Sequence, residues 1–160
     1  MIREIDRSEL PNCADVVRKS FQTVADEFGF TRENAPRFVA FATDTEKLQD
    51  QLDNQHRLMH VYCIDDKIVG FYSILLISDT ECELGSLSVL PEYRHRGIGE
   101  LLFRDSMDSA RSVGCKLMKL SIVEENKVLR NWYERLGAVH TGTKKFDFFP
   151  FTCGYMQVEL

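Results

Sequence analysis

The chain has 160 residues, of which 44% are hydrophobic and 28% are charged, and its formal net charge is −5 at pH 7. These values are typical of one globular domain with a sizeable core, which we expect to span residues 1–160. No basic run is present, which argues against a nucleic-acid partner, and no apolar run is long enough to span a bilayer. Because the N-terminus also lacks an apolar signal core, we expect a cytoplasmic protein with no membrane partner.

The five cysteines and four histidines predict neither disulfides nor a metal centre. The cysteines are odd in number, scattered and without a CxxC pair, so we expect reduced and mostly buried thiols. A nucleophilic cysteine would need a base beside it in space, and the spacing along the chain indicates none. The histidines show no metal-ligand spacing, so no metal is expected.

The N-terminal third predicts a short strand followed by helices. Residues 1–5 alternate between apolar and charged side chains, as a short strand does. Ser8 is a candidate N-cap for a helix that Gly29 would end, because apolar residues recur between them at helical spacing. A second helical region is expected from about Asn34, with a break near residues 43–44.

Three antiparallel strands are expected in the middle of the chain. Residues 61–64 and 68–76 form a hairpin, since β-branched and aromatic residues dominate both arms. Residues 81–89 continue this meander, and Pro91 ends the third strand because proline has no N–H to donate.

The remaining pattern predicts a crossover unit and two closing strands. A helix over residues 97–113 leads to a strand over 117–123, which should lie parallel to the strand over 81–89 in a right-handed βαβ unit. A short helix over 126–136 follows. Two strand candidates complete the chain, residues 139–148 and 153–160. The predicted fold class is α/β (α+β), with a mixed, mostly antiparallel sheet of about seven strands flanked by about four helices.

The turn over residues 94–99 combines several features of an anion site. It precedes a helix, whose first N–H groups lack intrahelical partners and whose dipole is positive at this end. Gly97 and Gly99 let a ligand approach the backbone, while Arg94 and Arg96 add positive charge. A phosphate or pyrophosphate is the expected ligand. The turn lacks the Gly-Lys-Ser/Thr of a Walker A loop, and Leu102 stands where a dinucleotide fingerprint has its third glycine.

Two motifs together resemble one known family. Residues 87–99, LSVLPEYRHRGIG, contain Arg-x-x-Gly-x-Gly and closely resemble the acetyl-CoA-binding motif of the GNAT N-acetyltransferase superfamily. Residues 132–137, WYERLG, resemble the aromatic-Tyr-Glu-Lys-Leu-Gly motif of the same family. The resemblance covers residues 61–137 well and the two ends poorly. It implies a GNAT-type sheet whose parallel strands splay apart, with the pantetheine arm of the cosubstrate acetyl-CoA in the gap.

The resemblance also implies a donor site that runs from the strand end into the turn and the next helix. An N–H at about Val89 would polarise the thioester carbonyl, and other backbone groups of the strand would pair with the pantetheine amides. The alternatives are a fully paired core strand and solvated arginines at a helix start. The implied cofactor-binding residues are Leu87, Ser88, Val89, Arg94, His95, Arg96, Gly97, Ile98, Gly99 and Asn126.

Glu83 and Tyr133 are the implied catalytic residues. Glu83 would take a proton from the amine, directly or through a water, and Glu81 is the substitute candidate. Because side chains alternate along a strand, Glu83 should share a face with Leu87 and Val89. Tyr133 would protonate the leaving thiolate. A solvated edge carboxylate and a core tyrosine are the corresponding alternatives.

The acceptor side is the least defined part of the sequence. Aromatic residues are candidates for its lining, although aromatic residues more often form cores, and Asp147 could hold a cation. These candidates are Phe30, Phe38, Phe41, Tyr72 and residues 146–151.

The expected function is transfer of an acetyl group from acetyl-CoA to a primary amine of a small-molecule or peptide acceptor, by direct attack in a ternary complex. Two alternatives stay open, a non-catalytic acyl-CoA-binding sensor or regulatory module of the same fold, and a protein that binds nucleotide phosphates. A homodimer that pairs the aromatic C-terminal strands also stays open.

Overall fold

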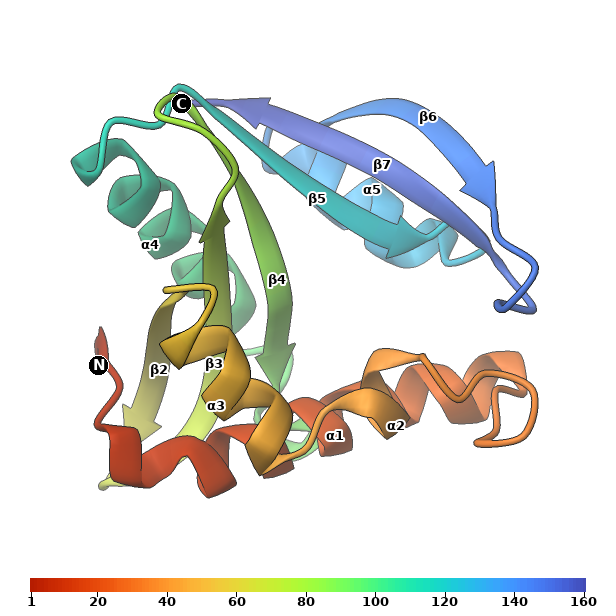
Figure 1. Ribbon diagram of the computed structural model, residues 1–160, viewed down its shortest axis with the longest axis horizontal. Coiled ribbons are helices and arrows are strands. Elements are labelled where there is room, and N and C mark those ends of the chain that lie inside the picture. Colours follow the sequence, from red (N-terminus) through yellow and green to blue (C-terminus); the bar gives the residue numbers. More distant parts are fainter.

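A computed structural model describes residues 1–160 and contains one seven-stranded sheet (Figure 1). The strand order is β1-β2-β3-β4-β5-β7-β6, and every neighbouring pair is antiparallel except β4 and β5. This arrangement confirms the predicted fold class. The strands are β1 (Ile2–Glu4), β2 (Leu58–Ile64), β3 (Lys67–Leu76), β4 (Glu81–Val89), β5 (Leu117–Val123), β6 (Val139–Lys145) and β7 (Thr152–Glu159).

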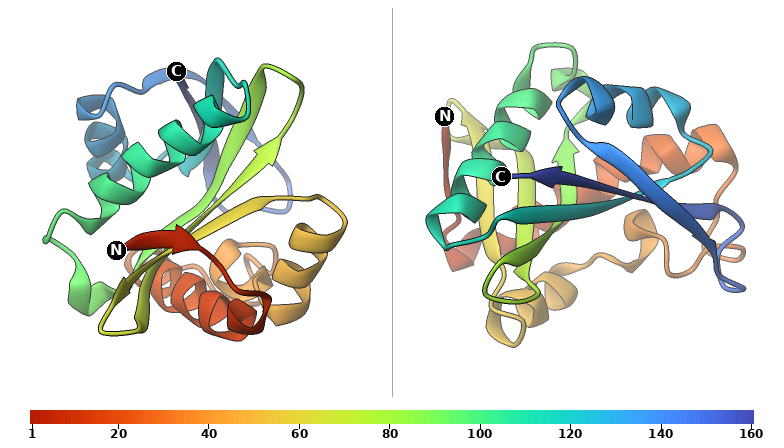
Figure 2. Two further views of the ribbon diagram at one scale, coloured as in Figure 1. Left: turned by 90° about the vertical axis from the view of Figure 1, so that its left-hand side faces the viewer. Right: turned by 90° about the horizontal axis from the view of Figure 1, so that it is seen from above.

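The sheet consists of two half-sheets, β1 to β4 and β5 to β7. The helices cover both faces of the first half-sheet and only one face of the second. Helix α4 lies on one face of β3 and β4, and α1 and α3 lie on the other (Figure 2). Helix α5 lies behind β5 and β7, whose opposite face carries no helix (Figure 1). None of the helices combines the length and the apolarity needed to cross a membrane. The helices are α1 (Leu10–Phe28), α2 (Val39–Ala42), α3 (Thr45–Asp53), α4 (Ile98–Ser112) and α5 (Lys127–Arg135), with short 3-10 turns η1 (Arg7–Glu9) and η2 (Pro91–Tyr93).

The N-terminal helices differ from the prediction at their starts. Asp6, not Ser8, is the first cap, because its carboxylate accepts from the Ser8 N–H in a capping box that begins η1. The second helical region begins at Val39 instead of Asn34. Asn34 is held in a turn with Thr31, since each side chain accepts from the other residue's N–H.

The parallel strands β4 and β5 are paired only at one end. Their register joins Glu81 to Leu117, Cys82 to Met118 and Glu83 to Lys119, and no pairing follows. Beyond these residues the two strands diverge (Figure 1). The splay that the family resemblance implied is therefore present.

A bulge in β4 overturns the expected side-chain alternation. Phe71 of β3 pairs with Ser88, but Ser73 pairs with Gly85, so β4 contains one extra residue between them. Ser86, in this interval, has φ 52. Because one extra residue reverses the alternation, positions before the bulge face opposite to the same-parity positions after it.

The predicted shared face of Glu83 and Val89 is therefore wrong. Val89 pairs with Gly70 on the face that packs against α4, where its Cγ2 atom lies near Gly99. Glu83 pairs with Leu75, two residues from Ser73, and faces the other side of the sheet.

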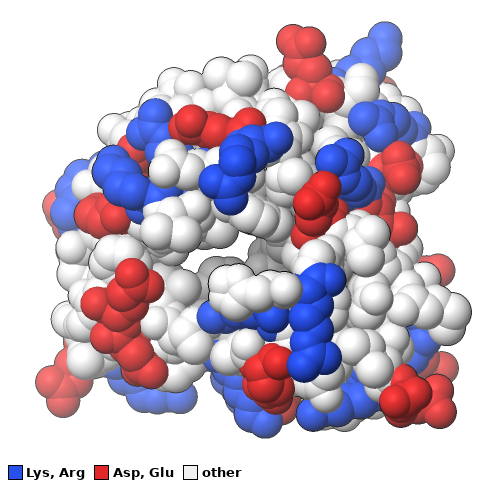
Figure 3. Space-filling view, turned by 180° about the vertical axis from the view of Figure 1, so that it is seen from behind, with Lys and Arg blue, Asp and Glu red and all other residues white.

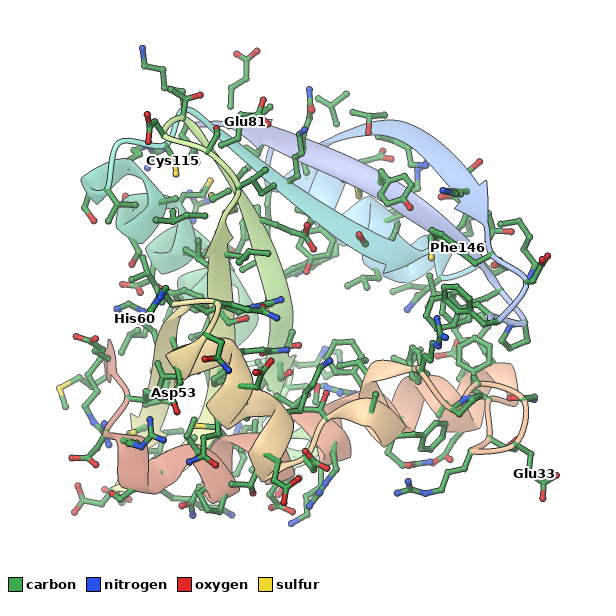
Figure 4. All side chains as sticks on the ribbon, in the orientation of Figure 1. Glu33, Asp53, His60, Glu81, Cys115 and Phe146 are labelled. Carbon is green, nitrogen blue, oxygen red and sulfur yellow. The ribbon has the colours of Figure 1, made fainter.

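A cluster of phenylalanines joins the outer ends of the two half-sheets. The Phe151 ring centroid lies 4.8 Å from that of Phe30, 5.7 Å from that of Phe38 and 4.6 Å from that of Phe149. We call these four residues the aromatic bridge. It links the segment after α1 to the loop between β6 and β7, where Phe146 also lies (Figure 4). Phe30 and Phe38 are thus buried in this second, smaller core, which agrees with the expectation that aromatic residues more often form cores.

Candidate active site

The turn over residues 94–99 leaves the first N–H groups of α4 free. Gly97 is the N-cap with φ 79, and no side chain caps the helix. Leu101 is the first residue whose N–H bonds back along the helix, to the Gly97 carbonyl. His95 is exposed and also left-handed, with φ 62. The N–H groups that precede Leu101 therefore remain available to an anion at the positive end of a 15-residue helix.

The two arginines of the turn have different environments. Arg94 donates 2.9 Å to Thr23 Oγ1 and 2.8 Å to the Ser20 carbonyl, so its guanidinium fastens the turn to α1. Burial lowers the pKa of Arg94 from its ordinary value. Arg96 is exposed and lies 5.1 Å from the centroid of the Tyr93 ring. Arg96 is therefore the arginine that can reach a phosphate.

Gly99 allows α4 and α5 to approach each other. A Cβ at this position would lie 3.3 Å from Cζ2 of Trp132, which is closer than ordinary packing allows. Ile98, its neighbour, is buried in the main core. The glycine therefore serves helix packing as well as access to the backbone.

The backbone of β4 presents a free N–H towards the splay. The Leu90 N–H donates to the Val69 carbonyl at 2.9 Å. Successive residues of a strand direct their N–H groups to opposite edges, so the Val89 N–H points away from β3. No β5 residue pairs with β4 there. Ser88 has a structural role, since its hydroxyl donates to the Ser86 carbonyl across the bulge at 2.7 Å, and Leu87 packs against the main core.

Tyr133 is buried in an aromatic setting on α5. Its ring centroid lies 5.5 Å from that of Phe103 and 4.9 Å from that of Trp132. Burial raises the pKa of the phenol well above its ordinary value, and no hydrogen bond within the chain engages the hydroxyl. The hydroxyl is therefore a neutral donor with no internal partner. Asn126 caps α5, because its side-chain oxygen accepts from the Leu129 N–H at 3.2 Å.

Glu83 opens onto a pocket between the two half-sheets. The pocket has a volume of about 520 Å³. Glu81 forms an ion pair with Lys119 at 3.2 Å, whereas Glu83 forms none. Glu83 is thus the less engaged of the two candidate carboxylates. Its pocket is lined mainly by polar residues of β5, β6 and β7, among them Lys119, Ser121, Thr141, Thr143, Tyr155 and Gln157.

This polar lining differs from the aromatic lining considered from the sequence. Tyr72 lies in the main core on the α4 face, where its hydroxyl bonds Asp105 at 2.6 Å. Asp147 is an exposed loop residue. The one signal of this polar lining in the sequence is the alternation of Lys119 and Ser121 with apolar residues in β5. The same alternation fits a sheet face exposed to water.

Two further observations bear on the chemistry. Burial raises the pKa of the Cys13 and Cys82 thiols to about 12, so neither supplies a thiolate near neutral pH. On the face that carries α4 and α5, a hollow opens near the centre of the molecule, and side chains of both charges surround it (Figure 3).

The model of the Acetyltransferase (GNAT) family matches residues 21–138. The chain belongs to the GNAT family. It is therefore an N-acetyltransferase that uses acetyl-CoA, and the free α4 N–H groups and Arg96 suit the phosphates of this donor.

Relatives and solved structures agree with this membership. An uncharacterized N-acetyltransferase of Lactobacillus delbrueckii subsp. lactis is 20% identical over 147 residues, covering 85% of this chain and 82% of the relative. The PaiA N-acetyltransferase of Thermoplasma acidophilum, solved with coenzyme A, has a TM-score of 0.83 at 21% identity and covers 100% of this chain and 98% of its own. The ribosomal-protein-S18-alanine N-acetyltransferase of Escherichia coli has a TM-score of 0.78 at 15% identity, covering 99% and 92%. At these identities the structures establish a common fold.

Proposed function

We propose that this GNAT enzyme acetylates a primary amine of a small-molecule or peptide acceptor by direct attack in a ternary complex. One observation carries this proposal. The β4 bulge puts Val89 and Glu83 on opposite faces of the strand, with Glu83 where the pairing to β5 ends and Val89 six residues further along the unpaired edge. A donor and an acceptor can therefore approach the same gap from opposite sides.

The donor would lie along the free edge of β4. Its pyrophosphate would sit at the α4 N-terminus, held by backbone N–H groups and Arg96. Its pantetheine amides would pair with the unpaired backbone of β4 like an added strand. The Val89 N–H would then donate to the thioester oxygen and stabilise the negative charge that develops there.

The chemistry would proceed in one attack and two proton transfers. The amine nitrogen attacks the thioester carbon, the new C–N bond forms, and the C–S bond breaks. Glu83 takes the proton that the amine loses through intervening waters, because six residues of β4, roughly 20 Å of extended strand, separate it from Val89. Tyr133 gives its proton to the departing thiolate and recovers one from solvent.

The relatives support an amine acceptor without choosing one. The E. coli structure is named for ribosomal-protein alanine, and another similar structure, with a TM-score of 0.76, is an aminoglycoside 6'-acetyltransferase. Both kinds of acceptor present an amine. We further infer that residues 1–160 act as one domain, since buried residues from Leu10 to Val158 share the main core. The mass of the protein in solution would test whether it forms a homodimer.

An acyl-CoA-binding module without turnover is the second candidate. It would need the phosphate turn but neither a free carboxylate at position 83 nor a buried phenol at position 133. The assay that separates the two measures thiol release from acetyl-CoA with a panel of amines. Tight binding of acetyl-CoA without thiol release from any amine would favour the module.

The role of Glu83 can be tested by the pH dependence of kcat/KM. Glu83→Gln removes the proposed base, so we expect the rising arm of the pH profile to flatten and activity near neutral pH to fall about 10²-fold or more. Glu81→Gln is the matched control, because it removes a neighbouring carboxylate that is paired with Lys119. An unaltered rising arm in Glu83→Gln would mean that the base is elsewhere or that the amine arrives deprotonated.

A further inference from the structure

Arg57 lies on the acceptor side of β4, outside the donor site. It belongs to the segment between α3 and β2 and is half-buried. Its Nε donates to Gln55 Oε1 at 2.7 Å, and its Nη1 lies 3.4 Å from Ser73 Oγ. Ser73 pairs with Gly85, so the guanidinium rests on the face of the sheet to which Glu83 also points.

The approach of Arg57 to β4 explains a glycine in that strand. A Cβ at Gly85 would lie 2.9 Å from both Arg57 Nη1 and Ser73 Oγ, so any other residue would have to displace the guanidinium and the hydroxyl. Gly85 and Glu83 are two residues apart on one face, about 7 Å along the strand. The positive charge of Arg57 is therefore held beside the proposed base.

The guanidinium has unused donors and no ion-pair partner within the chain, although the charge of Glu83 acts on it from further along the strand. Its Nη2 makes no hydrogen bond within the chain, and no carboxylate of the chain forms an ion pair with it. Arg94, which is also half-buried, differs because three acceptors on α1 satisfy it. A cation that is partly removed from water without a partner is costly, and an anion brought by a ligand would offset that cost.

We propose that Arg57 binds a carboxylate of the acceptor, so that the amine to be acetylated belongs to a molecule that carries a carboxylate close to that amine. This inference rests on the proposed function. The carboxylate would lie against the free edge of the guanidinium, which suits two-point recognition, while the amine would point from there into the gap that the donor occupies. A free amino acid and a peptide with an acidic residue beside its terminal amine both present this chemistry.

The main test compares acceptors that differ only in the carboxylate. Amino acids are assayed against their amides, and dipeptides with Asp or Glu at the second position against those with Asn or Gln, by thiol release. We expect the carboxylate form of at least one series to have a kcat/KM higher by about 10- to 100-fold, as a charge-assisted pair provides. The series with the larger ratio identifies the source of the carboxylate.

Arg57→Gln should abolish this ratio by raising the KM for the carboxylate acceptor, while the KM for acetyl-CoA stays unchanged. Arg57→Lys should restore part of the ratio, because it keeps the charge without the planar fork. Gly85→Ala should act like Arg57→Gln, since it displaces the guanidinium from the same place. A ratio near one in the wild type, or one that Arg57→Gln leaves intact, would overturn the proposal.

A binding measurement decides the case in which no acceptor turns over. N-acetylamino acids and their amides are titrated into the protein with CoA present. We expect the carboxylate compounds to bind more tightly to the wild type than to Arg57→Gln, and equal binding would overturn the role of Arg57. Thiol release from uncharged amines alone would overturn this inference but leave the proposed acetyltransferase intact. The absence of thiol release from every amine would count against the proposed function itself.

Discussion

Tyr133 and Arg94 show how much the surroundings of a single side chain narrow its role. Sequence motifs single out both residues, but the motifs fit a structural role of each residue as well as a functional one. Arg94 donates to Ser20 and Thr23 of α1, so Arg96 is the arginine that we propose for the phosphates. Ser20 lies 74 residues and Thr23 71 residues away along the chain, so no local pattern could have identified them.

Tyr133 leads to a prediction at this scale. Tyr133→Phe removes only the hydroxyl, so the packing against Phe103 and Trp132 should persist. We expect kcat to fall by about 10- to 10³-fold while the affinity for acetyl-CoA changes little, because the proposed role of the phenol is to protonate the leaving thiolate. Single-turnover kinetics and titration with CoA measure the two quantities separately. Equal turnover in the variant would remove Tyr133 from the chemistry.

The pH profile of the wild type gives an independent check of Tyr133. A phenol whose pKa burial raises keeps its proton to a higher pH than a free tyrosine, for which the pKa is about 10. Loss of the donor should therefore begin only above that pH. A falling arm below pH about 9 that is absent in Tyr133→Phe would contradict the raised pKa.

Among the elements, the helices and strands were largely predictable, and the bulge was not. Pro91 follows the end of β4 at Val89, as expected, and Gly114 adopts φ 93 just after α4 ends. The bulge at Ser86 has no such marker, because serine is not a residue that usually takes a positive φ. The bulge lies in the part of β4 that is still paired with β3 but is no longer paired with β5. That pairing reverses the faces of Glu83 and Val89, which local alternation could not anticipate.

The contact between α4 and α5 can be tested at Gly99. Gly99→Ala places a methyl group 3.3 Å from Trp132, while alanine favours the helix by about 1 kcal/mol relative to glycine. We expect stability to change by less than about 1 kcal/mol, because the partly buried indole can move by a few tenths of an ångström. The affinity for CoA should fall about tenfold, because a shift of the indole would also shift Tyr133 and the turn over residues 94–99.

Trp132 is the only tryptophan, so its fluorescence reports both the contact and CoA binding. Gly142→Ala is the matched control, because a Cβ at Gly142 meets no atom within 4 Å. Unchanged fluorescence and unchanged CoA affinity in Gly99→Ala would mean that the spacing of α4 and α5 does not set the donor site.

For the whole molecule, the aromatic bridge couples the two half-sheets. Phe151→Ala should destabilise the protein by about 3–5 kcal/mol, because it removes a buried ring that contacts three others. Phe148→Ala in the same loop should cost less than about 1 kcal/mol, since Phe148 is 39% exposed. Urea unfolding measures both. Equal losses in the two variants would show that the bridge does not join the halves energetically.

The bridge also gives the gap between β4 and β5 a continuous frame. The three paired positions close one end, at Glu83 and Lys119, and the phenylalanines close the other. In the proposed arrangement, a donor lying along the unpaired edge of β4 on one face of the sheet would leave the opposite face to the acceptor, so that acceptor and product could exchange while the donor stays bound.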